Sequence, residues 1–183
     1  SRWQRVFLPP SRNALIVRMK ILLIAGGWST EREVSLTGGR VMEKALKSLG
    51  HEVTFCDLLE NFDSILDLAG KHDFAMLNLH GTPGEDGLVQ AMLESGHCPY
   101  LGAGPTGSFL SLNKAVTKQV LRHAGLPTAD WEFLPTRPAP DWQTKLPFPV
   151  FAKSNLGGSS IHLGRAASRQ ELDALVKEIF DNG

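Results

Sequence analysis

The sequence predicts an α/β fold with a doubly wound parallel sheet, followed by the beginning of a second domain. Short apolar runs alternate with segments of helical periodicity up to about residue 126. Six of the 11 prolines then crowd between residues 127 and 149, which is typical of a domain border. We therefore expect residues 19–126 to form one domain, and residues 127–183 to hold a linker and the truncated first part of another.

The elements of the first domain follow from the apolar pattern. Strands are expected at Lys20–Ala25, Val53–Cys56 and Phe74–Leu79. A helix between the first two should bury one apolar face, made of Val34, Val41, Met42, Ala45, Leu46 and Leu49, and should end at Gly50. Weaker patterns predict helices at Ile65–Ala69, across Leu88–Leu93 before Gly96, and after Asn113 as N-cap.

The second unit reads as a hairpin and one helix. We expect strands at Phe148–Lys153 and Ile161–Gly164, joined by a tight turn at 157–160. The helix should run over Ser168–Phe180, with Ser168 and Glu171 forming a capping box. Because a hairpin and one helix cannot bury a full core, this unit is expected to be truncated or completed by a partner.

Composition favours a cytoplasmic globular protein. Hydrophobic residues make up 42% and charged residues 21% of the 183, and 19 basic side chains balance 19 acidic ones. Such a balance disfavours nucleic acid or an anionic membrane as partner. Cys56 and Cys98 form no CxxC pair, which suits a reducing compartment, and no apolar run approaches the roughly 18 residues of a membrane-spanning helix.

Residues 1–18 differ from the rest. They hold four arginines and no acid, so the remaining residues carry a net charge of −4. An arginine-rich leader can be a targeting peptide, but Pro9 and Pro10 would break the helix that such a peptide needs. We expect a non-native or disordered extension, with Met19 as the natural start.

Two glycine-rich segments could bind phosphate. Gly102–Gly107 fits the pattern G-x-G-x-x-G, but it does not follow the first strand and no acid lies about 20 residues further on, so we interpret it as a coincidence. Gly157–Ser160 lies between two expected strands, with Lys153 just before it. This segment could wrap phosphate oxygens or could be a plain hairpin turn.

Other polar residues gather where helices begin and strands end. Lys114 in a first helical turn opposes the helix dipole; a phosphate between its ammonium and the helix would relieve this, or the lysine is simply solvated at a small cost. His80 ends a strand, at the sheet edge where α/β proteins bind ligands, although a lone histidine there is more often structural. Thr30 and Glu33 can form a capping box, which leaves Glu31 for an ammonium-bearing ligand or for solvent.

Four segments together resemble a known family. Gly26–Ser35, Leu79–Gly87, Leu112–Lys114 and Lys153–Ser160 are similar in order and spacing to motifs of the D-alanine–D-alanine ligases, which are ATP-grasp carboxylate–amine ligases. The resemblance covers Met19 to Gly183. It implies a Rossmann-like preATP-grasp domain, the opening of an ATP-grasp domain, and a family that continues beyond Gly183.

The resemblance implies a two-step reaction for peptidoglycan synthesis. ATP would phosphorylate the carboxylate of one D-alanine, and the amine of a second would attack the D-alanyl phosphate. Glu31 and Ser159 would be catalytic, with Glu31 on the first substrate's ammonium, Ser159 in the same network and His80 beside the carboxylate. The residues that would hold ATP are Lys114, Lys153, Gly158, Ser159 and Ser160. The Mg²⁺ ligands of the family lie beyond residue 183, and the family is commonly a homodimer through its first domain.

Three positions depart from the family pattern. Asn113 stands where Asp is common, Ser154 where Pro is common, and His162 where Gly is common, so His162 could reshape the phosphate loop. Because other family motifs lie beyond Gly183, we expect this chain alone not to catalyse. The alternatives are another ATP-grasp ligase, acting on a different amino or hydroxy acid, and a non-catalytic ligand-binding module.

Overall fold

The structure is a computed structural model that describes residues 17–158 and 162–182. The expected extension, apart from Val17 and Arg18, lies outside the described residues. So do Ser159, Ser160 and Ile161 of the expected phosphate loop and returning strand.

Three parallel strands form the main sheet, as predicted. β1 (Lys20–Ala25) lies in the middle, with β2 (Glu52–Asp57) on one side and β3 (Phe74–Asn78) on the other. Tyr100 adds a parallel bridge to Ala75 on the outer side of β3. The carboxyl ends of all three strands therefore meet at one edge of the sheet.

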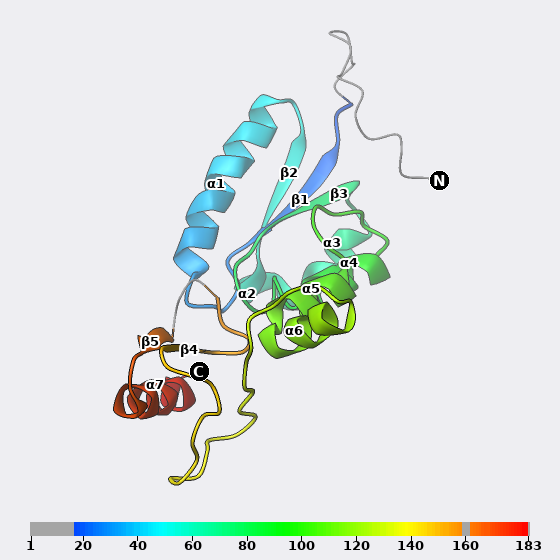
Figure 1. Cartoon of the computed structure of the whole chain (residues 1–183). Coiled ribbons are helices and arrows are strands. Elements are labelled where there is room, and N and C mark those ends of the chain that lie inside the picture. Colours follow the sequence, from blue (N-terminus) through cyan, green and yellow to red (C-terminus); the bar gives the residue numbers. More distant parts are fainter. Residues whose placement is uncertain (1–16, 159–161, 183) are drawn as a thin grey trace.

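Helices cover both faces of this sheet, which confirms the doubly wound arrangement. α1 (Arg32–Ser48) lies along one face, and α3 (Ile65–Ala69) and α4 (Leu88–Ser95) cover the other (Figure 1). The short segments α2 (Leu58–Asn61) and η1 (Phe62–Ser64) lead from β2 into α3. Because both faces are covered, the apolar run of β1 is buried from Ile21 onward.

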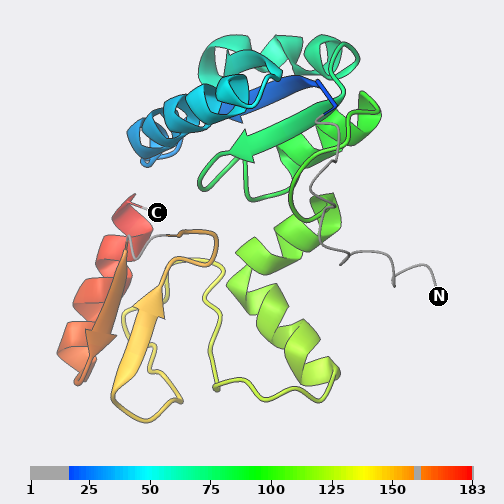
Figure 2. The same ribbon diagram turned by 90° about the horizontal axis from the view of Figure 1, so that it is seen from above.

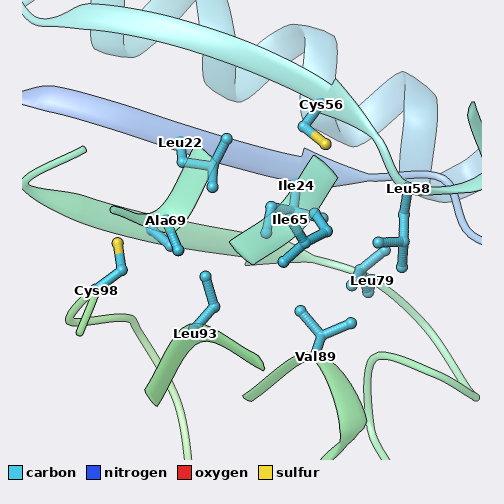
Figure 3. Close-up of a cluster of buried hydrophobic side chains, with 11 residues drawn as sticks. Leu22, Ile24, Cys56, Leu58, Ile65, Ala69, Leu79, Val89, Leu93 and Cys98 are labelled. Atoms are coloured by element: carbon cyan, nitrogen blue, oxygen red, sulfur yellow. The ribbon is translucent and has the colours of Figure 1, made fainter. Parts of the chain in front are cut away.

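The main core lies between the sheet and the α3–α4 side. Figure 3 shows side chains from the strands, α3 and α4 meeting there. Its fully buried large members include Leu22, Ile24, Leu58, Ile65 and Leu93. Cys56 and Cys98 are buried in the same cluster, so both cysteines act as small apolar side chains.

The expected apolar face of α1 is wrong. Its four members Val34, Val41, Ala45 and Leu49 are exposed, and only Met42 and Leu46 are partly buried. The buried residues are Ser35 and Gly39. A Cβ built on Gly39 would lie 2.8 Å from the Cβ of Ala25, so the missing side chain allows the helix to approach β1 closely.

Two helices follow the sheet. α5 (Pro105–Leu112) was not predicted; it begins within the Gly102–Gly107 segment, with Gly104 as N-cap and proline at the first helical position. α6 (Lys114–His123) begins after Asn113, whose side chain accepts a hydrogen bond from Val116 N, as predicted.

A hairpin and a helix follow the proline-rich segment. β4 (Val150–Lys153) pairs antiparallel with β5 (Leu163–Ala166), and α7 (Arg169–Asn182) packs against them as a separate group (Figures 1 and 2). β5 is shifted from the expected Ile161–Gly164 because Ala166 is fully buried against α7. Ser168 Oγ accepts from Glu171 N, which is one half of the predicted capping box, whereas the Glu171 carboxylate accepts from Ala167 N rather than from Ser168 N.

Across the described ranges, no helix is both long enough and apolar enough to cross a membrane.

Candidate functional site

The structure brings the loops of Glu31 and His80 together at the carboxyl edge of the sheet. Glu31 follows β1 and His80 follows β3, and both side chains are partly buried. A Cβ built on Gly81 would lie 3.3 Å from the Cβ of Ser29, so the two loops are in contact. Ser159, the third member of the expected substrate site, lies outside the described residues.

Hydrogen bonds join the ends of β1 and β3 to the first turns of α1. Gly26 N donates to Ser35 Oγ at 2.7 Å, and that hydroxyl donates to Asn78 O. Asn78 Nδ2 donates in turn to Ser35 O at 2.6 Å. The helix that begins beside Glu31 is thus tied to the strand that leads to His80.

An ion pair holds the same loop to the end of β2. Arg32 donates two hydrogen bonds of 2.6 Å to the Asp57 carboxylate and a third, of 3.1 Å, to Gly27 O. The Arg32 hydrogen bond is the main cause of a lowered pKa at Asp57. This pair was not predicted from the sequence, although opposite charges that follow neighbouring parallel strands are a usable signal.

The expected capping box of Thr30 and Glu33 is wrong. α1 begins at Arg32, so its N-cap is Glu31 itself. The hydroxyl that supports this start is that of Ser29, which accepts from Glu31 N at 3.2 Å, while Ser29 O accepts from Arg32 N at 3.1 Å. Glu31 therefore lies at the positive end of α1, where a carboxylate is stabilised.

The loop behind His80 is tightly held. Gly81 O accepts from the amides of Gly84 (2.9 Å) and Glu85 (2.8 Å). A Cβ on Gly84 would lie 2.2 Å from the Cβ of Leu79, so only glycine fits there. The buried Gln90 donates to Gly84 O at 2.6 Å, which fixes the loop to α4.

Lys114 and Lys153 come together at the junction of α6 with the β4–β5 loop. The Lys114 ammonium donates to Gly157 O and, at 3.3 Å, to Asn155 O. Burial lowers the pKa of Lys114, and repulsion by the Lys153 ammonium lowers it further. Within the described part of the chain neither lysine forms an ion pair with a carboxylate.

The expected phosphate between the Lys114 ammonium and the start of α6 would find the helix amides already occupied. Lys114 N donates to Asn155 O at 3.2 Å, Ala115 N to Asn155 Oδ1 at 2.9 Å, and Val116 N to Asn113 Oδ1 at 3.1 Å. Oxygens of Asn155 and of the N-cap Asn113 thus accept from the first amides of α6, and main-chain carbonyls of the loop accept from the Lys114 ammonium, which explains why a lysine is tolerated there.

The turn that carries Gly158 is partly described. Gly158 is exposed, with open space around it. Ser154 Oγ accepts from Gly157 N at 3.2 Å, a bond that a proline at this position could not make. His162 has φ of +51° and its ring lies 3.7 Å from the Glu178 carboxylate, so α7 contacts the start of β5.

The described residues include no group of three or more metal-ligating side chains. Among them, no cluster would hold Mg²⁺ by protein side chains alone.

Curated relatives and solved structures agree on one family, although no family model matches the chain. A D-alanine–D-alanine ligase of Desulfovibrio desulfuricans is 65% identical over 165 residues, which are 90% of this chain and 54% of the relative. One of Nitratidesulfovibrio vulgaris strain DP4 is 57% identical over 162 residues, or 88% of this chain and 54% of the relative. The chain is homologous to the D-alanine–D-alanine ligases.

Solved ligase structures share the fold. The D-alanine–D-alanine ligase of Bacillus anthracis superposes with a TM-score of 0.76 at 37% identity, over 89% of this chain and 54% of that one. The structure of the same ligase complexed with ATP superposes with a TM-score of 0.77 at 34% identity, over 90% of this chain and 54% of that one. These matches confirm the predicted family and fold class, and the chain spans about half the length of the ligases that it matches.

Proposed function

We propose that this chain supplies the substrate-binding domain and part of the ATP site of a D-alanine–D-alanine ligase. The observation that carries the proposal is the Lys114 ammonium bound to the loop into which Lys153 leads, with no described carboxylate paired to either lysine. Two such ammonium groups suit the phosphates of ATP. The homology to the ligases supports the same assignment.

In this proposal Glu31 holds the ammonium of the first D-alanine, and His80 lies beside its carboxylate. Glu31 and Ser159 are the catalytic residues of the hydrogen-bond network around this substrate. Lys114 and Lys153 hold the ATP phosphates, together with the loop residues Gly158, Ser159 and Ser160. Arg32 and Asp57 keep the Glu31 loop in place through their two 2.6 Å hydrogen bonds.

The chemistry requires two anions to approach each other. A carboxylate oxygen of the first D-alanine attacks the γ-phosphorus of ATP, and ADP leaves with the bonding electron pair. The amine of the second D-alanine then attacks the acyl carbon, phosphate leaves, and the new amide nitrogen loses a proton. Lysine ammonium groups lower the repulsion in the first step.

The wider assignments are part of the same proposal. Residues 19–126 form the substrate-binding domain, and residues 127–183 are the linker and first part of the ATP-grasp domain. The whole ligase acts in the cytoplasm in peptidoglycan synthesis, as a homodimer through the first domain.

A chimera tests this proposal. The chain replaces the matching residues of the D. desulfuricans ligase, and formation of D-alanyl-D-alanine, ADP and phosphate is measured. We expect ATP-dependent dipeptide synthesis that falls by about 100-fold or more in Lys153→Ala. Lys44→Ala is the matched control, because Lys44 is an exposed lysine on α1.

The chain by itself, with ATP, Mg²⁺ and D-alanine, should give no sustained synthesis above its Lys153→Ala variant. A folded chimera that makes no dipeptide would refute the proposal. Calorimetric binding of D-alanine without any ATP affinity in that chimera would indicate a non-catalytic ligand-binding module instead.

A further inference from the structure

The β4–β5 loop supplies hydrogen-bond acceptors to the first amides of α6. They come from Asn155, which lies 40 residues after Ala115 in the sequence. Asn155 O accepts from Lys114 N at 3.2 Å, and Asn155 Oδ1 accepts from Ala115 N at 2.9 Å. These are amides that a helix leaves without partners in its first turn. Asn155 therefore acts as a second cap, beside the local N-cap Asn113.

The two caps are joined to each other. Asn155 Nδ2 donates to Asn113 Oδ1 at 3.0 Å, and the same oxygen accepts from Val116 N. Asn155 must present an acceptor to Ala115 and a donor to Asn113 at the same time, which an amide can do and a carboxylate cannot.

The β4–β5 loop, held against α6 by Asn155, also determines where the Lys114 ammonium lies. Its acceptors are the main-chain carbonyls of Asn155 and Gly157, both in this loop. Lys153, at the end of β4, leads directly into the same loop. If the loop detaches from α6, the ammonium loses its acceptors and the distance between the two lysines is no longer fixed.

We propose that Asn113 and Asn155 are a positioning pair that sets the Lys114 ammonium beside Lys153 and thereby sets the affinity of the chain for a polyphosphate. This inference rests on the proposed function, because that function assigns the two lysines to phosphate. The asparagines act through Lys114 and the loop.

Binding of inorganic tripolyphosphate to the full chain, measured by calorimetry, tests the pair. Asn155→Asp places a second acceptor against Asn113 Oδ1, and Asn155→Ala removes both side-chain bonds. We expect each to weaken binding by about tenfold. Combining Asn113→Ala with Asn155→Ala should weaken binding by less than the product of the two single effects, because the residues share one bond.

Two controls separate positioning from stability and charge. Ser168→Ala removes the cap of α7, so it should lower the thermal midpoint and leave the affinity unchanged. Gln143→Glu adds one charge at an exposed position and should also leave it unchanged.

The outcomes discriminate between the two proposals. If wild type binds more tightly than Lys114→Ala while both Asn155 variants bind as wild type does, the positioning role is refuted and the proposed function stands. If wild type binds no more tightly than Lys114→Ala, the phosphate assignment of Lys114 fails, and the positioning role fails with it. If Asn155→Asp does not fold, Asn155→Ala decides, since it keeps the main-chain carbonyl on which Lys114 depends.

Discussion

Gly39→Ala should push α1 away from the sheet. A Cβ on Gly39 would lie 2.8 Å from Ala25 Cβ and 3.0 Å from Phe55 Cε2, whereas carbon atoms in good contact are about 3.5–4.0 Å apart. Ala25 is fixed by the strand backbone. The Arg40 guanidinium lies 3.6 Å from the centroid of the Phe55 ring, so a shift of the ring would disturb that contact.

The expected net effect is a loss of stability. Overpacking against two such neighbours costs about 2–3 kcal/mol. Replacing glycine by alanine within a helix returns about 1 kcal/mol. The free energy of unfolding should therefore fall by about 1–2 kcal/mol.

Gly107→Ala is the matched control within α5. Its added Cβ would lie 3.5 Å from Ala103 Cβ, an ordinary contact, so the same exchange should stabilise by about 0.5–1 kcal/mol. Urea unfolding followed by circular dichroism measures both variants. If Gly39→Ala stabilises the chain as much as Gly107→Ala does, the close approach of α1 to the sheet is wrong. The affinity of the Gly39→Ala variant for D-alanine is a second measurement. It should change, because Glu31 at the start of α1 would move with the helix.

Two further predictions concern titratable groups. Burial raises the pKa of the Cys56 thiol to about 11, so iodoacetamide at pH 8 should label Cys56 only as the chain unfolds; labelling at equal rates in native and urea-unfolded chain would contradict this. Because the Arg32 hydrogen bond lowers the pKa of Asp57, its contribution to stability is complete above the unfolded value of about 3.9 and is lost as the pH falls through the lower folded value. Acid titration of the unfolding free energy should therefore be less steep in Asp57→Asn than in the exposed control Asp63→Asn, and equal slopes would refute the role of the pair.

Much of the fold could be predicted from short segments of sequence. The strand at Lys20–Ala25 and the helix at Ile65–Ala69 have the predicted bounds, and Asn113 caps α6 as expected. Such features depend on side-chain periodicity and on caps that act within a few residues. α5 was missed because its start lies in a glycine-rich segment, although the proline at its first turn is a usable signal.

The candidate site was predictable only in part. Its polar residues could be found because they follow strands or begin helices, as Glu31 and His80 do. The long-range contacts that position these residues could not be found in this way. Arg32 pairs with Asp57, 25 residues further on, and Asn155 caps a helix that begins about 40 residues before it. Nothing in the local sequence shows which distant groups meet.

The amino-acid sequence by itself determined the order of strands and helices, the family and the positions of the polar motifs. Each of these features depends on residues that lie close together in the chain. Only the tertiary structure decided that Gly39 rather than Val41 faces the sheet, and that oxygens of Asn155 rather than a phosphate accept from the first amides of α6. Both depend on how closely two separate elements approach, and that distance is set by the packing of the whole chain.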